Sequence, residues 1–333
     1  MEFEQDATAP RGLLFFHAKE GRPLATPWQV AALRAQAVAE HDLPEGVVLD
    51  CACGSGIQLA AYAATLQRPV LGVELDEERA RASAVNLRTV AEHARDGEAA
   101  WFVESRVLAG DGTAADGVVN AVNDENIRVA FLHLDPARPR NSRTHALEEM
   151  QPPLDRVLEA WAPHFSPAPE GPAVLLDLSP RLTAVQRSEV EKIVERVWPG
   201  VAKTWEWTSR GRGRVDRLAL WLGGIASQRV ARRFVRVPST PAEMPVVLST
   251  EAEESTLVHR HHPPKRGEQV SIVDAALVES GLVNAWLADV NAEDQHRWLS
   301  PKDDALNSTT IARSIWLTKM RGLFRPPAGW WNC

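Results

Sequence analysis

The clearest chemical motif in the sequence is a glycine-rich segment, LDCACGSG, at residues 49–56. It follows an apolar, strand-like segment and precedes a helix-like one, which is the context that a ligand-binding loop requires. Gly54 and Gly56 allow a tight turn and a close approach of the backbone to a ligand. Gln58 stands where a dinucleotide-binding loop has its third glycine, so the motif favours S-adenosylmethionine (SAM), which has no phosphates. The candidate cofactor residues of this segment are Asp50, Ala52, Gly54 and Gly56.

Two acidic residues further along the chain are candidates for the same ligand. Glu74 ends the second predicted strand, roughly 20 residues after the glycine-rich segment, where a carboxylate accepts hydrogen bonds from ribose hydroxyls. The alternatives are that Asp76 takes this role, or that Glu74 is an ordinary surface carboxylate in the run ELDEE. Asp111, in AGDGT, follows the third predicted strand and is a candidate for contact with the adenine amino group. Its alternative is a turn aspartate.

A third motif, LDPARPR at residues 134–140, ends the fourth predicted strand. Its Asp-Pro pair resembles the Asp/Asn-Pro-Pro-aromatic motif of amino-methyltransferases, in which a side-chain oxygen and a backbone carbonyl orient an exocyclic amino group by hydrogen bonding. Ala137 and Arg138 replace the second proline and the aromatic residue, and Arg138 could stack on a base or hold a phosphate. Asp135, Pro136 and Arg138 are therefore the candidate catalytic residues, with a turn-capping Asp135 as the alternative.

Five nearly continuous apolar segments are the candidate strands that must position these residues. Such segments are typical of strands that are buried on both faces of a parallel sheet. They are Val47–Ala52, Val70–Leu75, Ala100–Ser105, Val129–Asp135 and Ala173–Ser179. Helical segments lie between most of them, at Gln58–Leu66, Glu77–His93 and Leu147–Trp161. This alternation predicts an α/β fold with a doubly wound parallel sheet.

Two further candidate strands, Lys203–Thr208 and Arg217–Leu222, are separated only by SRGRGRVD. A connection that short predicts an antiparallel hairpin. Five parallel strands and a terminal hairpin make a seven-stranded, Rossmann-like sheet of the class I methyltransferase type.

The chain divides into three predicted parts. Residues 1–45 form an N-terminal helical extension, in which residues 27–41 have apolar side chains at helical spacing. Residues 46–225 hold the sheet and the three motifs. After Gly224 the pattern changes to several prolines and the polar stretches STEAEEST and HRHHPPKRG, which predicts the loops of a separate, small α+β domain at residues 226–333.

The composition narrows the setting. Of the 333 residues, 44% are hydrophobic and 24% are charged, which is ordinary for a soluble globular protein. No apolar run approaches the roughly 20 residues of a membrane span, and the first residues lack the features of a signal peptide. Three cysteines cannot build a disulfide framework, which favours a reducing, cytoplasmic location. We expect neither a membrane nor a metal partner.

The cysteines and histidines suggest two other chemistries, which we consider much weaker. Cys51 and Cys53 lie in the glycine-rich segment, where they face a cofactor rather than a pyrimidine ring that a nucleophilic thiol would attack. A metal site would need more ligands than these two thiols. The three histidines His259, His261 and His262 are far away in the sequence, in a predicted solvated loop.

The charged residues bear on a nucleic-acid partner. A net charge of −7 argues against wholesale wrapping of nucleic acid but not against a local basic face. Basic residues beside aromatic ones suit phosphate contact and base stacking, although a solvated arginine face over packed tryptophans fits equally well. One group is Arg210, Arg212, Arg214, Arg217, Arg229, Arg232, Arg233 and Arg236. The other is Arg313, Lys319, Arg321 and Arg325 with Trp316, Trp330 and Trp331.

Several longer stretches, taken together and in order, resemble the class I SAM-dependent methyltransferases that carry a C-terminal THUMP-like domain. They are ATPWQVAALRA, LDCACGSG, HLDPARP, PPLDRVLEAW, LLDLSPRL, WEWTSRGRGRVDRLALWLGG and IVDAALVESGLVNAWLADVNAEDQHRWLSP. The resemblance implies SAM as cofactor and RNA as partner, with methylation of an exocyclic or ring nitrogen of a tRNA or rRNA base. Two alternatives stay open: a non-catalytic RNA-binding protein on a decayed methyltransferase fold, and a methyltransferase for a small molecule or a protein.

Overall fold

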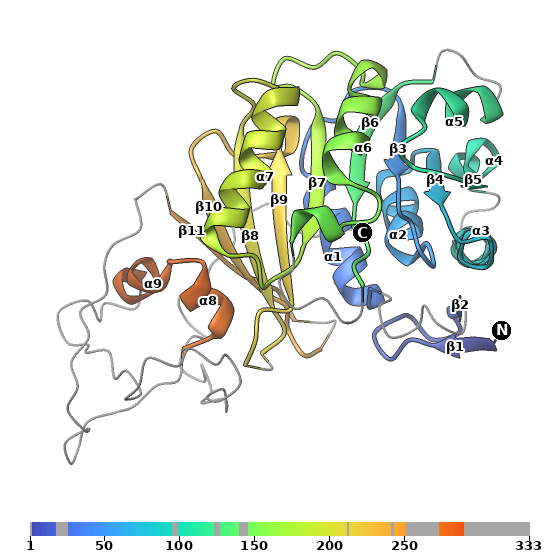
Figure 1. Cartoon of the computed structure of the whole chain (residues 1–333). Helices are drawn as coiled ribbons and strands as arrows, with labels where there is room; N and C mark the ends of the chain where they lie inside the picture. Colours follow the sequence, from blue (N-terminus) through green and yellow to red (C-terminus); the bar gives the residue numbers. More distant parts are fainter. Residues whose placement is uncertain are drawn as a thin grey trace.

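Short apolar strands and amphipathic helices alternate along the chain, and in the computed structural model they build one large sheet with helices on both faces (Figure 1). The structure describes residues 2–17, 26–94, 99–122, 127–139, 146–211, 213–240, 243–250 and 273–289. The strands are β1 (Glu2–Gln5), β2 (Leu14–His17), β3 (Val47–Asp50), β4 (Val70–Glu74), β5 (Arg106–Ala109), β6 (Val129–Leu134), β7 (Ala173–Leu178), β8 (Lys203–Ser209), β9 (Arg217–Leu222), β10 (Arg232–Arg236) and β11 (Val246–Thr250). The helices are α1 (Trp28–Ala39), α2 (Ile57–Leu66), α3 (Glu77–His93), α4 (Ala100–Glu104), α5 (Ala115–Val122), α6 (Leu154–Trp161), α7 (Ala184–Val197), α8 (Ala275–Glu279) and α9 (Val283–Asp289).

The sheet has the order β11-β10-β8-β9-β7-β6-β3-β4-β5. Strands β3 to β7 pair in parallel with one another, whereas β9 runs antiparallel to both β7 and β8. The strand order reverses between β3 and β6, and ligands of doubly wound sheets bind outside the carboxyl ends of the strands at such a switch point. The predicted parallel sheet and its antiparallel hairpin are thus confirmed.

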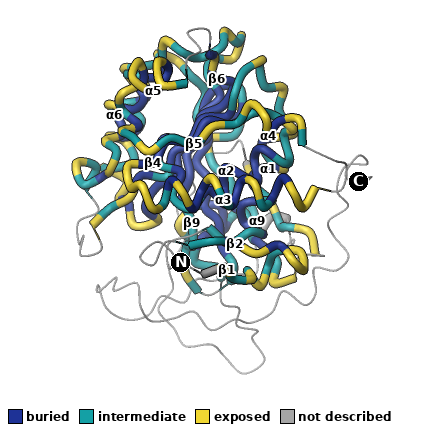
Figure 2. Tube along the Cα trace, turned by 90° about the vertical axis from the view of Figure 1, so that its right-hand side faces the viewer, coloured by how far each residue is buried: buried dark blue, intermediate teal, exposed yellow. Residues whose placement is uncertain are grey.

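Alternate side chains of the central strands enter two separate cores, one on each face of the sheet. Val48 and Phe131 belong to the core under α1, α2 and α3, whereas Leu49 and Leu132 belong to the core under α5, α6 and α7. Figure 2 shows the strands as the buried interior of the molecule. Burial on both faces explains why these strands have continuous apolar sequences.

Two predicted elements differ from the structure. Residues 100–105, predicted as a strand, form the short helix α4, and the third parallel strand is β5 at Arg106–Ala109. Strand β5 lies at the edge of the sheet and is half exposed, so its sequence lacks the apolar run that marks a central strand. The apolar run before it holds Trp101, which is buried in the core beside α2 and α3.

The predicted helix Leu147–Trp161 is interrupted. A single turn of 3₁₀ helix covers Leu147–Glu149, and α6 begins only at Leu154. Pro152 and Pro153 lie between the two pieces, and proline removes a backbone donor and obstructs the preceding turn of a helix. The predicted helices at residues 27–41, 58–66 and 77–93 are confirmed as α1, α2 and α3, and α5 and α7 are additional to the prediction.

The sheet of the described residues has nine strands instead of the predicted seven. Residues 232–250, assigned by sequence to the C-terminal part, form β10 and β11, and β10 pairs in parallel with β8. Within the described residues of the N-terminal part, the hairpin β1–β2 precedes α1. Residues 251–272 and 290–333 of the predicted THUMP-like domain lie outside the described residues. Within the described part of the chain, no helix is long and apolar enough to cross a membrane.

Candidate active site

A cleft of about 1490 Å³ opens where the parallel strands β3, β4, β6 and β7 end. Residues that follow each of these strands line it, because the carboxyl ends of parallel strands lie at one edge of the sheet. All of the predicted site residues except Gly56 are in its wall. They are Asp50, Ala52, Gly54, Glu74, Asp111, Asp135, Pro136 and Arg138.

The glycine loop (residues 49–56) and Glu74 form one hydrogen-bonded unit. The Gly54 N–H donates to Glu74 Oε2 at 2.9 Å, and the Asp76 N–H donates to Glu74 Oε1 at 3.1 Å. Glu74 is only 7% exposed, but each carboxylate oxygen has a second lone pair for a ligand. Asp76 has a different role, because it caps α3 by accepting the Arg79 N–H at 2.9 Å. Glu74 is thus buried against the glycine loop, whereas Asp76 is exposed at the start of α3.

The glycines of the site meet different surroundings. A Cβ on Gly56 would lie 2.1 Å from Ser83 Oγ, so Gly56 allows the loop to pack on α3 rather than lining the cleft. A Cβ on Gly54 would have no atom within 4 Å, and Gly54 has a φ of +54°. Gly112, which sequence reasoning did not select, passes so close that a Cβ would lie 2.4 Å from the Cys51 carbonyl oxygen.

Asp111 lies in the cleft wall with the geometry of a turn aspartate. Its Oδ1 accepts the Thr113 N–H at 2.9 Å and the Thr113 hydroxyl at 2.8 Å. The adjacent Gly112 carbonyl accepts the Trp161 Nε1–H at 2.8 Å, which ties this loop to α6. These contacts agree with the alternative interpretation of Asp111 as a turn aspartate.

Asp135 is held from the side of the terminal hairpin. Its Oδ2 lies 3.3 Å from Arg217 Nη1, and Arg217 Nη2 donates to Thr26 Oγ1 at 3.2 Å. Burial and the charge of Asp177 raise the pKa of Asp135, whereas the Arg217 guanidinium opposes that rise. Asp135 is therefore a stronger base than an exposed aspartate, within reach of a ligand in the cleft.

The residues after Asp135 are fixed by the opposite wall. The Ala137 N–H donates to the Gln151 carbonyl at 2.8 Å, and the Gln151 N–H donates to the Ala137 carbonyl at 2.9 Å. Arg138 lines the cleft, and its buried Nε and Nη2 have no hydrogen-bond partner in the described part of the chain. Burial lowers the pKa of Arg138. Arg138 therefore places a cation in the wall of the cleft, next to Asp135 and Pro136.

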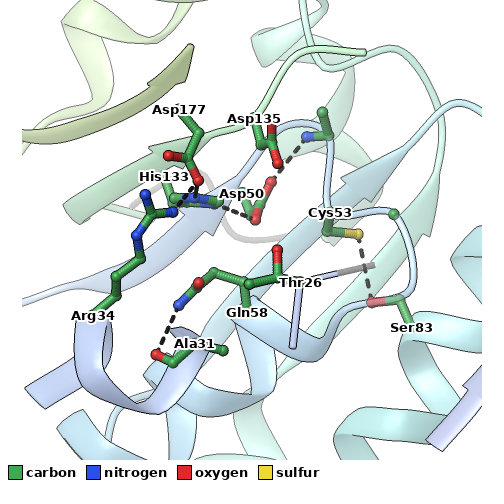
Figure 3. Close-up of polar contacts among 12 residues, drawn as sticks. Thr26, Ala31, Arg34, Asp50, Cys53, Gln58, Ser83, His133, Asp135 and Asp177 are labelled. Atoms are coloured by element: carbon green, nitrogen blue, oxygen red, sulfur yellow. Dashed lines mark hydrogen bonds and ion pairs between the residues drawn. The ribbon is translucent and has the colours of Figure 1, made fainter. Parts of the chain in front are cut away.

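Three charged residues that sequence reasoning did not select adjoin this site. His133 lies between two carboxylates, with Nδ1 2.7 Å from Asp50 Oδ2 and Nε2 3.4 Å from Asp177 Oδ2 (Figure 3). Arg34 of α1 forms an ion pair with the same Asp177 oxygen. Burial opposes the charging of His133, but the charge of Asp50 and the hydrogen bonds to Asp177 and Asp50 outweigh it and raise the pKa of His133 to about 9. The sequence does hold a sign of His133 and Asp177, because each is the one titratable residue within an otherwise apolar strand, VAFLHL for His133 and AVLLDL for Asp177.

No family model and no curated protein matches the chain. Among solved structures it is similar to a candidate methyltransferase from Porphyromonas gingivalis W83, with 15% identity and a TM-score of 0.53 over 81% of this chain. The match covers 59% of that protein, so the chain spans about three fifths of its length. A candidate class I SAM-dependent methyltransferase from Listeria monocytogenes has 13% identity and a TM-score of 0.44, and the match covers 68% of this chain and 69% of that one. The strand order and the first of these likenesses decide the architecture. This chain has the class I methyltransferase fold.

The two thiols of the glycine loop are held in the protonated form at neutral pH. Cys51 and Cys53 are both buried beside the switch point, and burial together with the nearby Asp50 raises the pKa of each thiol well above its ordinary value. A thiol is a nucleophile only as a thiolate, so these two are unreactive at neutral pH.

Most of the described arginines in the first cluster are engaged within the protein. Arg233 pairs with Glu206 at 2.7 Å and lies over the Trp221 ring, Arg236 pairs with Asp274, and Arg210 lies 3.3 Å from Asp216. These arginines brace the terminal strands rather than forming an open basic face. The second cluster (residues 313–331) and the histidines at 259–262 lie outside the described residues.

Proposed function

We propose that this protein is a SAM-dependent methyltransferase that modifies a nitrogen of an RNA base, in a tRNA or rRNA. The observation that carries the proposal is the cleft at the switch point, whose wall contains the glycine loop, Glu74 and the Asp135 motif from the ends of strands β3, β4 and β6. These residues were selected from three separate stretches of sequence, so their convergence on one cleft is independent support. The fold supports the same reaction class, although a fold alone does not define a function.

The residues at the β3–β4 end of the cleft fit SAM. Gly54 leaves open space beside the loop, and Gly112 brings a second loop against the first. Glu74, Asp50 and Asp111 give this end carboxylates, which complement the ammonium and sulfonium charges of SAM and accept from its hydroxyl and amino donors. When bound, SAM supplies an electrophilic methyl group.

The residues at the β6 end of the cleft fit a nitrogen acceptor. Methylation of an N–H group releases one proton, and Asp135 carries a carboxylate whose pKa is raised by burial. The pairing of Ala137 with Gln151 holds the Asp135-Pro136 turn in place, so that the carboxylate and the Pro136 carbonyl can both accept from an amino group. In this proposal, the protein contributes mainly positioning and a local base.

A second acceptor class has a specific observation in its favour. The internal ion pairs of Arg210, Arg233 and Arg236 reduce the number of arginines available for phosphates. A small molecule or a protein would not need a basic face, so it is the alternative acceptor.

The proposal is tested in two stages with purified, folded protein. Calorimetric titration with SAM and with S-adenosylhomocysteine is expected to show micromolar binding, which Gly54→Asp and Glu74→Gln weaken. The matched control is Glu78→Gln, which removes an exposed carboxylate on α3 outside the cleft wall. No binding by the folded wild-type protein would exclude the enzyme and favour a non-catalytic RNA-binding protein.

The acceptor is then identified with methyl-labelled SAM and a cell extract. Label in RNase-sensitive material that Asp135→Ala abolishes would support RNA, and binding to that RNA is expected to weaken with salt. Label that survives RNase treatment would instead support a protein or a small molecule.

A further inference from the structure

A row of charged side chains crosses the face of the sheet that α1 and α2 cover. In the sheet register, Asp50 on β3 is the direct partner of His133 on β6. Farther along, Asp177 on β7 aligns through Ala219 with Glu206 on β8. These charged residues are at most 4% exposed. Burying charges is costly unless each is paired, so a row of this kind requires a specific arrangement of partners.

His133 is the central member of the row. Each of its ring nitrogens faces a carboxylate oxygen, Asp50 on one side and Asp177 on the other. An ionised carboxylate only accepts hydrogen bonds, so both nitrogens must carry a hydrogen for both contacts to form. The imidazole ring is therefore an imidazolium in this arrangement, and the raised pKa of His133 agrees.

The groups that face His133 come from every element packed around it. They are Asp50 of β3, Asp177 of β7, Arg34 of α1, Tyr62 of α2, and Asp135 two residues along the same chain segment. The Tyr62 ring lies 5.4 Å from the imidazole, but the buried Tyr62 hydroxyl has no hydrogen-bond partner among the described residues. Tyr62 thus contributes packing to His133 and no hydrogen bond.

Asp50 transmits the position of His133 to the glycine loop. While its Oδ2 faces His133, its Oδ1 accepts the Ala52 N–H at 3.0 Å. The Cys53 N–H then donates to the Val73 carbonyl at 3.2 Å, and the Gly54 N–H donates to Glu74. The orientation of one buried carboxylate therefore sets the start of a chain of backbone hydrogen bonds through the loop.

We propose that His133 is a positioning residue for the glycine loop. As an imidazolium it bridges Asp50 to Asp177, and Arg34 anchors the far end of the bridge to α1. The bridge holds Asp50 in the orientation that orders residues 51–54. This inference rests on the proposed function, because it takes the loop to be the one that holds SAM.

The test compares wild-type protein, His133→Gln and Tyr62→Phe by titration with S-adenosylhomocysteine from roughly pH 6 to pH 10. Wild-type affinity is expected to fall as His133 loses its proton near its pKa of about 9. His133→Gln is expected to bind about tenfold more weakly below that pH, the loss of one charge-assisted hydrogen bond, and to lack this step. Tyr62→Phe removes only the unpaired hydroxyl and is expected to match wild type. The amino group of S-adenosylhomocysteine also titrates in this pH range, but it does so equally with all three proteins. The effect of His133 is therefore read from the difference in affinity between the proteins at each pH.

The outcomes separate this inference from the proposed function. If His133→Gln binds with wild-type affinity and the wild-type pH profile, the inference is wrong and the function stands. If folded wild-type protein binds no S-adenosylhomocysteine, the function fails, and amide hydrogen exchange then decides the inference. Faster exchange at Ala52 in His133→Gln but not in Tyr62→Phe supports it, and equal exchange overturns it. If His133→Gln does not fold, the ¹⁵N shifts of the His133 ring in wild type decide, because a titration near its ordinary value of 6.5 overturns the inference.

Discussion

Raising the pH from about 6.5 to about 9 is expected to destabilise this protein through His133. The pKa of His133 is about 9 in the fold and 6.5 is its ordinary value, because Asp50 and Asp177 favour the charged ring. Below about pH 6.5 both states hold the proton and the full contribution to stability is present. Between the two values only the folded state holds it, so stability falls as the pH rises, and above about pH 9 the contribution is gone.

The magnitude follows from the size of the shift. Each unit of pKa difference corresponds to about 1.4 kcal/mol, so the shift of His133 predicts a loss of ~3 kcal/mol across this window. That is a large share of the stability of a typical domain, which is roughly 5–15 kcal/mol.

Urea unfolding at several pH values measures this loss, with His133→Gln as the comparison. The buried thiols of Cys51 and Cys53, whose pKa values burial raises, also favour the folded state less as the pH rises. They contribute equally to both proteins and cancel in the difference. Wild type is expected to lose ~3 kcal/mol more than the variant between the two pH values. Parallel stability curves for the two proteins would refute the buried imidazolium.

Three further predictions concern the loops and the cleft. Gly112→Ala is expected to destabilise the protein by about 1–3 kcal/mol, because the new Cβ would meet the Cys51 carbonyl, whereas Gly110→Ala meets no atom within 4 Å and is expected to be neutral in thermal unfolding. Arg217→Met removes the cation that lowers the pKa of Asp135, so the acid limb of the methyl-transfer pH profile is expected to move to higher pH, and an unmoved limb would contradict the role of Asp135. In a Cys333→Ser variant, whose only thiols are Cys51 and Cys53, Ellman's reagent is expected to react at neutral pH only after unfolding, and rapid reaction of the native variant would contradict their burial.

The sequence predicted the parts of the site that depend on short-range patterns. Asp50 and Asp135 could be placed because each ends an apolar strand, and the carboxyl ends of parallel strands lie at one edge of the sheet. Glu74 could be placed by its spacing from the glycine loop. In contrast, β5 could not be found from its own residues, because an edge strand with one covered face has no continuous apolar run, and the neighbouring AWFVE does.

The ion pairs of Asp50, Asp135 and Asp177 could not be predicted, because each joins residues that are far apart in the sequence. His133 reads as one polar residue in an apolar strand until the register places Asp50 opposite it. The clustered arginines pointed the opposite way. Their proximity in sequence suggested that they form one basic face. In the structure, Arg217 pairs with Asp135 and Arg233 pairs with Glu206, so these two arginines bind different acidic partners within the protein.

The charge balance of the cleft depends on residues from outside its central strands. Three aspartates lie at the carboxyl ends of the adjacent strands β3, β6 and β7, and each faces a cation. Asp50 faces His133, Asp135 faces Arg217, and Asp177 faces Arg34. Arg217 comes from the terminal hairpin and Arg34 from α1, within the part of the chain that the sequence assigned to an N-terminal extension.

Removal of residues 1–45 is therefore expected to damage the cleft as well as the packing of α1. It would leave Asp177 buried without its guanidinium, and breaking a buried ion pair typically costs about 3–5 kcal/mol. Arg34→Met in the full chain separates the two effects, because it keeps the apolar stem of the side chain and most of the helix packing. If Arg34→Met unfolds at the wild-type urea concentration, the ion pair adds nothing and α1 acts by packing alone. If it is destabilised and its His133 pKa changes, α1 is part of the electrostatics of the site.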